Sequence, residues 1–241
     1  MTPSEPATSV PELPVPVSAW ADLDVGERTR RTRRRLLLAA ATVFDAQGYR
    51  GAALSDILAV AGLTKGALYF HFRSKHALAE ALLAEVCDSW LLMTEEIARR
   101  GTDPMWRLLL ETDAYVARWM HDPLVRGISR AISEPDLREH RTTWMATWES
   151  STAELLAQAE TAGLLAPGVD PVRAARAIVA VAVGNYGLAD GPDDLWTRMT
   201  ESWEGLVPIM TTPEWARSWA ASDWRRRPRP DAERYRSARE P

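Results

Sequence analysis

The stretch Ala61-Gly-Leu-Thr-Lys-Gly-Ala-Leu-Tyr-Phe-His-Phe72 decides how the N-terminal part of the chain folds. Gly62 is suited to end one helix, because glycine adopts the left-handed conformation of a C-cap at little cost. Thr64 is a favourable N-cap for the helix that follows. Upstream, residues 54–61 place their apolar side chains on one helical face. Two short helices joined by a tight, glycine-containing turn predict a helix-turn-helix.

Both lysines of the chain, Lys65 and Lys75, lie in or beside this stretch, whereas every other basic residue is an arginine or a histidine. Lys65 falls in the first turn of a helix, where the helix dipole disfavours a cation by about 0.3–1 kcal/mol. Gly66 costs about 1 kcal/mol relative to alanine. Both residues are explained if this turn presses against DNA, since glycine allows close approach and lysine can reach a guanine edge or a phosphate. The alternative is a solvated helix with a stray lysine.

Other polar residues around the turn are candidates for phosphate contacts. Tyr69 and His71 can donate hydrogen bonds to phosphates, and Lys75 follows Ser74, a predicted N-cap, at the start of a long helix. Six arginines cluster at the beginning of the first predicted helix: Arg28, Arg30, Arg31, Arg33, Arg34 and Arg35. We expect this run to be a basic arm along the DNA backbone or in the minor groove, or else only a solvated face.

The charge distribution separates a basic segment from an acidic one. The chain has a net charge of −4, yet residues 28–75 carry +8 and residues 76–221 carry −10. This asymmetry is typical of a polyanion-binding head attached to an acidic body. Residues 1–27 carry −5 and are rich in proline, which predicts a disordered leader. Residues 222–241 carry +3 and form a basic tail, expected to be either a disordered solubilising segment or a source of non-specific DNA affinity.

Composition excludes several classes of protein. The sequence has no apolar run of transmembrane length and no recognisable signal peptide, so we expect a cytoplasmic, nucleoid-associated protein with no membrane partner. Cys87 is the only cysteine, which excludes an internal disulfide and a multi-cysteine metal site. The four histidines show no nearby nucleophile and no metal-ligand spacing: His71, His76, His121 and His140. We therefore expect no cofactor, no metal and no enzymatic activity.

The remainder of the chain is also predicted to be helical, because apolar residues recur at helical spacing and no alternating strand pattern occurs. Gly48 ends the first predicted helix, 28–47, and Ser74 begins a long helix that reaches Arg100. Prolines separate the later predicted helices, which cover 104–121, 123–133, 136–162, 170–190, 193–210 and 213–224. The expected fold class is all-α, with a three-helix helix-turn-helix head and a larger helical body.

Residues 30–80 resemble the DNA-binding domain of TetR-family repressors, through Phe44-Asp-Ala-Gln-Gly-Tyr49, Leu54-Ser-Asp-Ile57 and the stretch 61–72. The phrase Thr64-Lys-Gly-Ala-Leu-Tyr-Phe-His-Phe72 is most similar to the γ-butyrolactone autoregulator receptors of actinobacteria. This resemblance implies a homodimer with a helical ligand-binding and dimerisation domain, bound to a palindromic operator in double-stranded DNA. It also implies release by a small γ-butyrolactone, butenolide or furan effector, and control of antibiotic biosynthesis.

The resemblance assigns roles to individual residues. Lys65 and Gly66 would contact base edges. Five others would lie at or near phosphates: Ser55, Thr64, Tyr69, His71 and Lys75. The family usually has threonines just before Leu54, where this chain has Ala52 and Ala53, so an N-cap worth about 0.5–2 kcal/mol is missing. The phosphate contacts would then pass to the arginine run, chiefly to Arg30, Arg31, Arg33 and Arg34.

All but one of the 11 tryptophans follow the head, and most are expected to pack in a core or an interface. The resemblance implies that one of them covers the ligand. The candidates are Trp148, which fits best, Trp144 and Trp119. The uncharged segment 177–189 is expected to be buried, with Asn185 and Tyr186 bound either to a dimer partner or to the ligand. Helices 170–190 and 193–210 are the expected dimer faces.

Two alternatives to a lactone-released repressor stay open. Val183 stands where many receptors of this subgroup have a threonine for the lactone ring, which leaves the effector uncertain. One alternative is a pseudo-receptor, a DNA-binding regulator without a lactone ligand. The other is a drug-sensing repressor of an efflux pump, which would need a wider and more promiscuous pocket.

Overall fold

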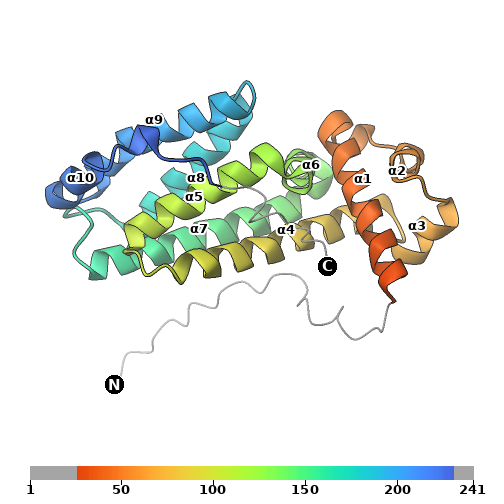
Figure 1. The fold of residues 1–241 in the computed structure, drawn as a ribbon, viewed down its shortest axis with the longest axis horizontal. Coiled ribbons are helices and arrows are strands. Elements are labelled where there is room, and N and C mark those ends of the chain that lie inside the picture. The colour runs from red at the N-terminus through yellow and green to blue at the C-terminus, as the bar shows by residue number, and fades with distance from the viewer. Residues whose placement is uncertain (1–25, 231–241) are drawn as a thin grey trace, which may run out of the picture.

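The computed structural model describes residues 26–230, and this part of the chain is helical with no β-strand, as predicted (Figure 1). The α-helices are α1 (Glu27–Gly51), α2 (Leu54–Ala61), α3 (Lys65–His71), α4 (Lys75–Ala98), α5 (Pro104–His121), α6 (Pro123–Ala131), α7 (Arg138–Thr161), α8 (Pro171–Leu188), α9 (Pro192–Met210) and α10 (Pro213–Ala220). Two short 3-10 helices are η2 (Pro135–Leu137) and η3 (Trp224–Arg226). Within the described range, no helix is both long and apolar enough to cross a membrane. Almost all of the predicted leader lies outside the described residues.

Helices α1–α3 form the head, at one end of the elongated molecule (Figure 1). Gly48 has a φ of 72° and kinks α1 where the sequence predicts the first helix to end. Gly62 caps α2 in the left-handed conformation, and the Thr64 side chain caps α3. Four fully buried side chains lie between these helices: Leu36, Phe44, Ile57 and Leu68. The predicted helix-turn-helix is confirmed.

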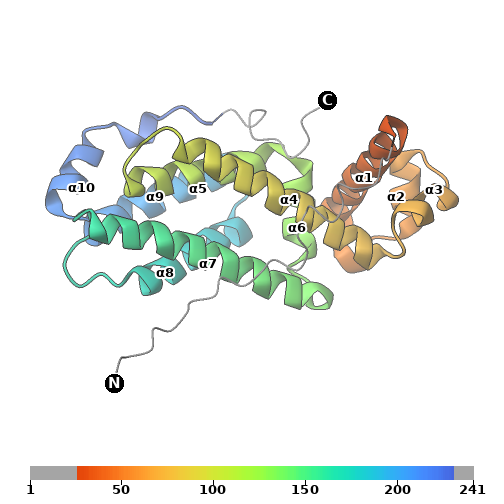
Figure 2. The same cartoon turned by 90° about the horizontal axis from the view of Figure 1, so that it is seen from below.

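Helices α4–α10 form the body. Five of them begin with a proline, whose missing N–H and fixed φ suit the first helical position. These prolines are Pro104, Pro123, Pro171, Pro192 and Pro213, so the predicted helix breaks are confirmed. Helix α5 packs against α4, α7 and α9, while α7 and α8 run along each other (Figures 1 and 2). The central helix of the body is therefore α5, and most of its residues are buried.

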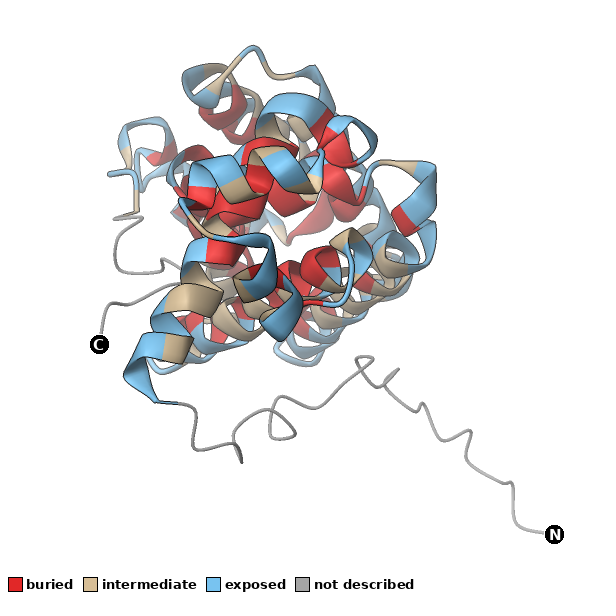
Figure 3. Cartoon of the chain, turned by 90° about the vertical axis from the view of Figure 1, so that its right-hand side faces the viewer, coloured by how far each residue is buried: buried red, intermediate tan, exposed pale blue. Residues whose placement is uncertain are grey.

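Helices α4 and α6 join the head to the body. Helix α6 packs along α1 so closely that a Cβ added to Gly127 would lie 2.3 Å from the carbonyl oxygen of Ala41. Leu78 and Leu82 of α4 belong to the same buried cluster as the head core. Figure 3, which views the head end, shows buried segments on the inner faces of the helices. The hydrophobic core therefore continues across the predicted domain boundary after residue 75.

One face of α8 and α9 exposes apolar side chains. Val183 and Leu188 of α8 are 42% and 69% exposed, and Ile209 of α9 is 69% exposed. The expectation that 177–189 is buried is thus wrong for the single chain, because one side of α8 has no covering helix. Exposed apolar side chains gathered on two packed helices are candidates for an interaction surface.

Candidate functional site

The N-terminal turn of α3 presents a cation, a glycine and aromatic rings to solvent. Leu68 is fully buried and fixes α3 to the head, whereas Tyr69 and Phe70 are 46% and 77% exposed. Lys65 is exposed, with its Nζ 5.8 Å from the centre of the Tyr69 ring. The nearest atom that a Cβ on Gly66 would meet is 3.9 Å away, so the backbone here is accessible. This surface has the positive charge and open backbone that a base-reading helix needs.

Three predicted phosphate contacts flank this surface. The exposed Thr64 uses its hydroxyl oxygen as an N-cap, accepting a hydrogen bond of 3.3 Å from the α3 backbone. Ser55 is exposed on the first turn of α2, 3.4 Å from the Asp56 carboxylate. Burial, and secondly the charge of Arg33, lowers the pKa of His71, so its imidazole is neutral at pH 7. His71 can donate a hydrogen bond but brings no positive charge to a phosphate.

The arginine run forms the first turns of α1, within the predicted first helix. Arg33 lies 3.8 Å from the Glu85 carboxylate of α4, and its guanidinium is 5.5 Å from the centre of the Phe72 ring. Arg35 donates a 2.7 Å hydrogen bond to the carbonyl oxygen of Ala61 at the end of α2. Both arginines hold α1 against its neighbours. Arg28, Arg30 and Arg31 are exposed, and Arg34 is half-buried.

Lys75 is bound within the protein. Its Nζ donates hydrogen bonds to the carbonyl oxygens of Tyr49 and Ala52, at 2.7 and 2.9 Å, and to that of Arg50 at 3.4 Å. The ammonium also lies 4.5 Å from the centre of the Tyr49 ring. These contacts use all three donors of an ammonium and complement the negative end of the α1 dipole. Lys65 therefore faces solvent, whereas Lys75 would have to leave α1 to reach a phosphate.

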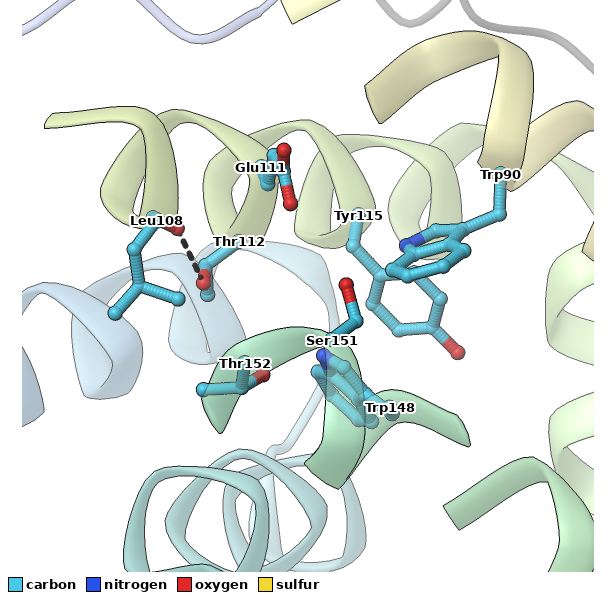
Figure 4. Close-up of a pocket in the computed structure, with 8 residues that line it drawn as sticks. All are labelled: Trp90, Leu108, Glu111, Thr112, Tyr115, Trp148, Ser151 and Thr152. Atoms are coloured by element: carbon cyan, nitrogen blue, oxygen red, sulfur yellow. Dashed lines mark hydrogen bonds between the residues drawn. The ribbon is translucent and has the colours of Figure 1, made fainter. Parts of the chain in front are cut away.

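A small cavity lies between α4, α5 and α7, with Trp148 as one wall (Figure 4). Its lining residues are Trp90, Leu108, Glu111, Thr112, Tyr115, Trp148, Ser151 and Thr152. The ring centres of Tyr115 and Trp148 are 5.2 Å apart. The cavity volume is about 10 Å³, which holds about one water molecule. A lactone could enter only if these aromatic side chains moved apart.

An aromatic cluster, comprising Tyr115, Trp119, Trp148 and Tyr186, continues from the cavity towards α8. The ring centre of Tyr186 lies 5.5 Å from that of Tyr115, 5.7 Å from that of Trp119 and 6.5 Å from that of Trp148. The Tyr186 hydroxyl is buried and finds no hydrogen-bond partner among the described residues. Burial raises its pKa well above its usual range, so the hydroxyl stays protonated. It is an unused donor within a cluster that reaches the cavity.

Two further predicted ligand residues have partners inside the chain. Trp144 is 4% exposed and packs edge-on against Trp90, with ring centres 5.8 Å apart, so it supports the cavity wall from behind. Asn185 donates a hydrogen bond of 2.9 Å to the hydroxyl of Ser202 on α9. Val183 is exposed on α8 and does not line the cavity, so it cannot replace a ring-binding threonine there.

The polar lining supplied by α5 was not predicted from the sequence. Glu111 and Thr112 line the cavity and are buried, with exposed fractions of 7% and 5%. Burial raises the pKa of Glu111, and a 2.7 Å hydrogen bond from Arg107 opposes the rise. Adjacent polar residues in the apolar helix 104–121 are the signal that could have identified them, because buried polar groups need partners.

A buried arginine connects the cavity helix with the helices that reach the head. Arg118 of α5 is fully buried and donates a 2.7 Å hydrogen bond to Ser89 of α4. It also lies 3.5 Å from the carboxylate of Asp122, the N-cap of α6. Burial lowers the pKa of Arg118, and the negative charge of Asp122 opposes this. Arg118 therefore contacts both α4 and the junction between α5 and α6.

The described part of the tail, residues 222–230, packs on the body, so its predicted disorder is wrong there. Three of its arginines pair with body acids: Arg225 with Glu204, Arg227 with Asp113 and Arg229 with Asp193. Arg227 donates to both oxygens of Asp113, at 2.5 and 2.8 Å, and its guanidinium lies 3.7 Å from the ring centre of Trp224. These three arginines pair with acids of the body, which offsets part of its negative charge.

Comparisons with known proteins agree with the helix-turn-helix. Residues 36–82 match the family described as bacterial regulatory proteins, tetR family. The A-factor receptor protein of Streptomyces griseus is 33% identical over 77% of this chain and 66% of that protein, just under two thirds of its length.

Solved structures resemble the whole described fold. One, which concerns the molecular basis for control of antibiotic production by bacterial hormones, has 31% identity and a TM-score of 0.66, covering 76% of this chain and 98% of that one. A γ-butyrolactone receptor, an ArpA-like protein, has 25% identity and a TM-score of 0.67, covering 80% and 94%. These relatives are regulators rather than enzymes. The chain therefore belongs to the tetR family of bacterial regulatory proteins.

Proposed function

We propose that the protein is a homodimeric transcriptional repressor that reads a palindromic operator with α3 and is released by a γ-butyrolactone-like effector. The observation that carries this proposal is the position of α4. It begins directly after α3, and its Trp90 forms a wall of the cavity that also contains Trp148. The similarity to the A-factor receptor and to a γ-butyrolactone receptor supports the effector class and a role in antibiotic production.

Release of the protein from DNA would follow from the helix movements that open the cavity. A lactone between Trp90, Tyr115 and Trp148 would displace α4 relative to α5 and α7. The head would follow, because the start of α4 lies in the head core and Arg118 connects α5 to α4 and α6. In a dimer, the two α3 helices must sit about 34–36 Å apart to enter successive major grooves. A ligand that binds the displaced state better would lower DNA affinity by the same coupling free energy.

The uncovered face of α8 and α9 supports the proposed homodimer. Its exposed apolar side chains need a partner surface, and Gly184, Gly187 and Gly205 have no atom within 4 Å of an added Cβ. Such positions allow another helix to approach closely. Two helices from each chain would then form a four-helix bundle.

The test uses an operator that the protein itself selects from random DNA. Binding is followed by fluorescence anisotropy while butyrolactones, butenolides and furans are added separately. We expect wild-type protein to be released by at least one class, and Trp148→Ala to bind the operator normally without being released. Release of Trp148→Ala at wild-type ligand concentrations would contradict the assignment of the cavity.

A pseudo-receptor is the second candidate, because the cavity of about 10 Å³ is far smaller than a usual ligand pocket. It would bind the selected operator and remain bound with every compound. A drug-sensing efflux repressor would instead be released by unrelated apolar drugs. The same titration, extended to a panel of unrelated apolar drugs, therefore separates the three functions.

A further inference from the structure

Two histidines and a glutamate meet where α4 and α7 begin. His76 and Glu80 are four residues apart on α4 and share a face, with His76 Nε2 3.6 Å from Glu80 Oε1. His140 comes from the first turn of α7, and its Nε2 lies 3.3 Å from the same carboxylate oxygen. The sequence predicts no metal-ligand spacing at these histidines. The fold corrects this, because His140 follows Glu80 by 60 residues and only tertiary structure unites them.

The geometry of this cluster suits a transition metal. Zn²⁺ binds histidine nitrogen and carboxylate oxygen at about 2.0–2.2 Å, so neighbouring ligand atoms in a tetrahedral site lie about 3.3–3.6 Å apart. The two measured separations fall in this range, and one ligand atom from each residue lies within 4.8 Å of the others. We propose that His76, Glu80 and His140 bind a divalent transition-metal ion of the Zn²⁺ type, which ties α4 to α7.

The surroundings leave the cluster accessible to an ion. The side chains of His76 and Glu80 are 46% and 49% exposed, so a water can complete the coordination. Lys75, the neighbour of His76, directs its ammonium to carbonyl oxygens at the end of α1. Arg50 is held by Asp136 through two hydrogen bonds, at 2.9 and 3.0 Å. Neither cation is hydrogen-bonded to Glu80, so neither competes with a metal for its carboxylate.

A metal here would restrain the helix that carries the DNA-reading head. His76 and Glu80 lie in the first two turns of α4, and Trp90 of the same helix lines the cavity opposite Trp148 of α7. An ion that pins α4 to α7 would oppose any ligand that moves them apart. This consequence, which rests on the proposed function, makes metal and effector mutually antagonistic, since coupling between two sites is reciprocal.

The test of the site is independent of DNA and effector. Untagged full-length protein is titrated with Zn²⁺ in competition with a chromophoric chelator. We expect one Zn²⁺ per chain and a Zn²⁺-dependent rise in Tm. His140→Ala should weaken binding at least tenfold and abolish the rise in Tm, whereas the exposed His121→Ala should behave as wild type. Glu80→Gln preserves the side-chain shape and should also weaken binding.

Folding of each variant is checked by its Tm without metal, so lost binding cannot be mistaken for unfolding. Stoichiometric binding that His140→Ala and Glu80→Gln leave unchanged would overturn the site, as would the absence of stoichiometric binding to wild type. A second titration measures effector release of operator DNA with and without Zn²⁺. If Zn²⁺ binds but leaves release unchanged, the site stands and the antagonism is overturned.

Discussion

At the scale of single residues, the two lysines of the chain have different environments. Lys65 is exposed at the start of α3, while Lys75 holds three carbonyl oxygens at the end of α1. The sequence predicts an exposed cation at Lys65, because helix capping by Thr64 is a local property. It could not predict the partners of Lys75, since the carbonyl groups of Tyr49 and Ala52 come together only when α1 kinks at Gly48.

Replacing Lys75 should therefore lower stability rather than only weaken DNA binding. We expect Lys75→Met to lower the free energy of unfolding by about 1–3 kcal/mol, because charge-assisted hydrogen bonds are lost and carbonyls at the end of α1 lose their partners. Urea denaturation measures the change. The matched substitution Lys65→Met should stay within about 0.5 kcal/mol of wild type. Equal effects of the two substitutions would contradict the structural role.

The single cysteine should be unreactive in the native protein. Burial raises the pKa of Cys87 to about 12, compared with an ordinary value of 9.0. Little thiolate therefore exists at pH 8, and Ellman's reagent should label the protein only after denaturation. Between pH 9 and pH 12 the thiol ionises in the unfolded chain but not in the folded one. The free energy of unfolding is therefore unaffected by this group below pH 9. Above pH 9 it falls by up to about 1.4 kcal/mol per pH unit. Rapid labelling of native protein at pH 8 would contradict the burial.

At the scale of elements, the most extensive packing between the body and α1 of the head is made by α6. The sequence predicts its start at Pro123 but not its tight packing on α1, because that contact depends on a glycine whose helical context gives no signal. Gly127 leaves no room for a side chain beside Ala41. The polar residues within α5 are a signal in the sequence, but they do not identify Arg227 as the partner of Asp113, because these two residues are far apart in the chain.

A methyl group at this contact should separate the two helices. We expect Gly127→Ala to lower the free energy of unfolding by about 1–3 kcal/mol, since the new Cβ would overlap the backbone of α1. Chemical denaturation provides the measurement. As a control, Gly51→Ala places its Cβ at an ordinary 3.5 Å from Gln47 and should be neutral. A Gly127→Ala protein as stable as wild type would show that α6 can move without cost.

At the scale of the whole molecule, the all-α class, the head and the helix breaks could be predicted, because they follow from local periodicity, capping and proline. The cavity walls, the tail and the histidine cluster could not, because each unites residues far apart in sequence. Arg227 illustrates this: in a run of arginines it resembles a solvated charge, yet it is buried against Asp113. The uncharged segment 177–189 was expected to be buried, and its exposed side chains support the proposed second chain.

The proposed dimer can be tested with two equally exposed leucines. Leu188 on α8 and Leu92 on α4 are 69% and 66% exposed. We expect Leu188→Asp to produce monomers in light scattering after size-exclusion chromatography, because a buried unpaired charge at an interface is strongly unfavourable. Leu92→Asp should remain dimeric. If both variants remained dimeric, or if both became monomeric, the assignment of the interface to this part of α8 would be contradicted.

The most direct test of the account is the discrimination between selected operator and random DNA by wild type and Lys65→Ala, measured by anisotropy at one salt concentration. Wild type should prefer the operator by about a thousandfold or more. Lys65→Ala should lose about 1–3 kcal/mol of this preference, because a base contact is removed. Arg28→Ala, which removes an exposed charge from the first turn of α1, should weaken binding to both DNAs equally. If Lys65→Ala keeps the full wild-type preference, α3 does not read the operator through this residue.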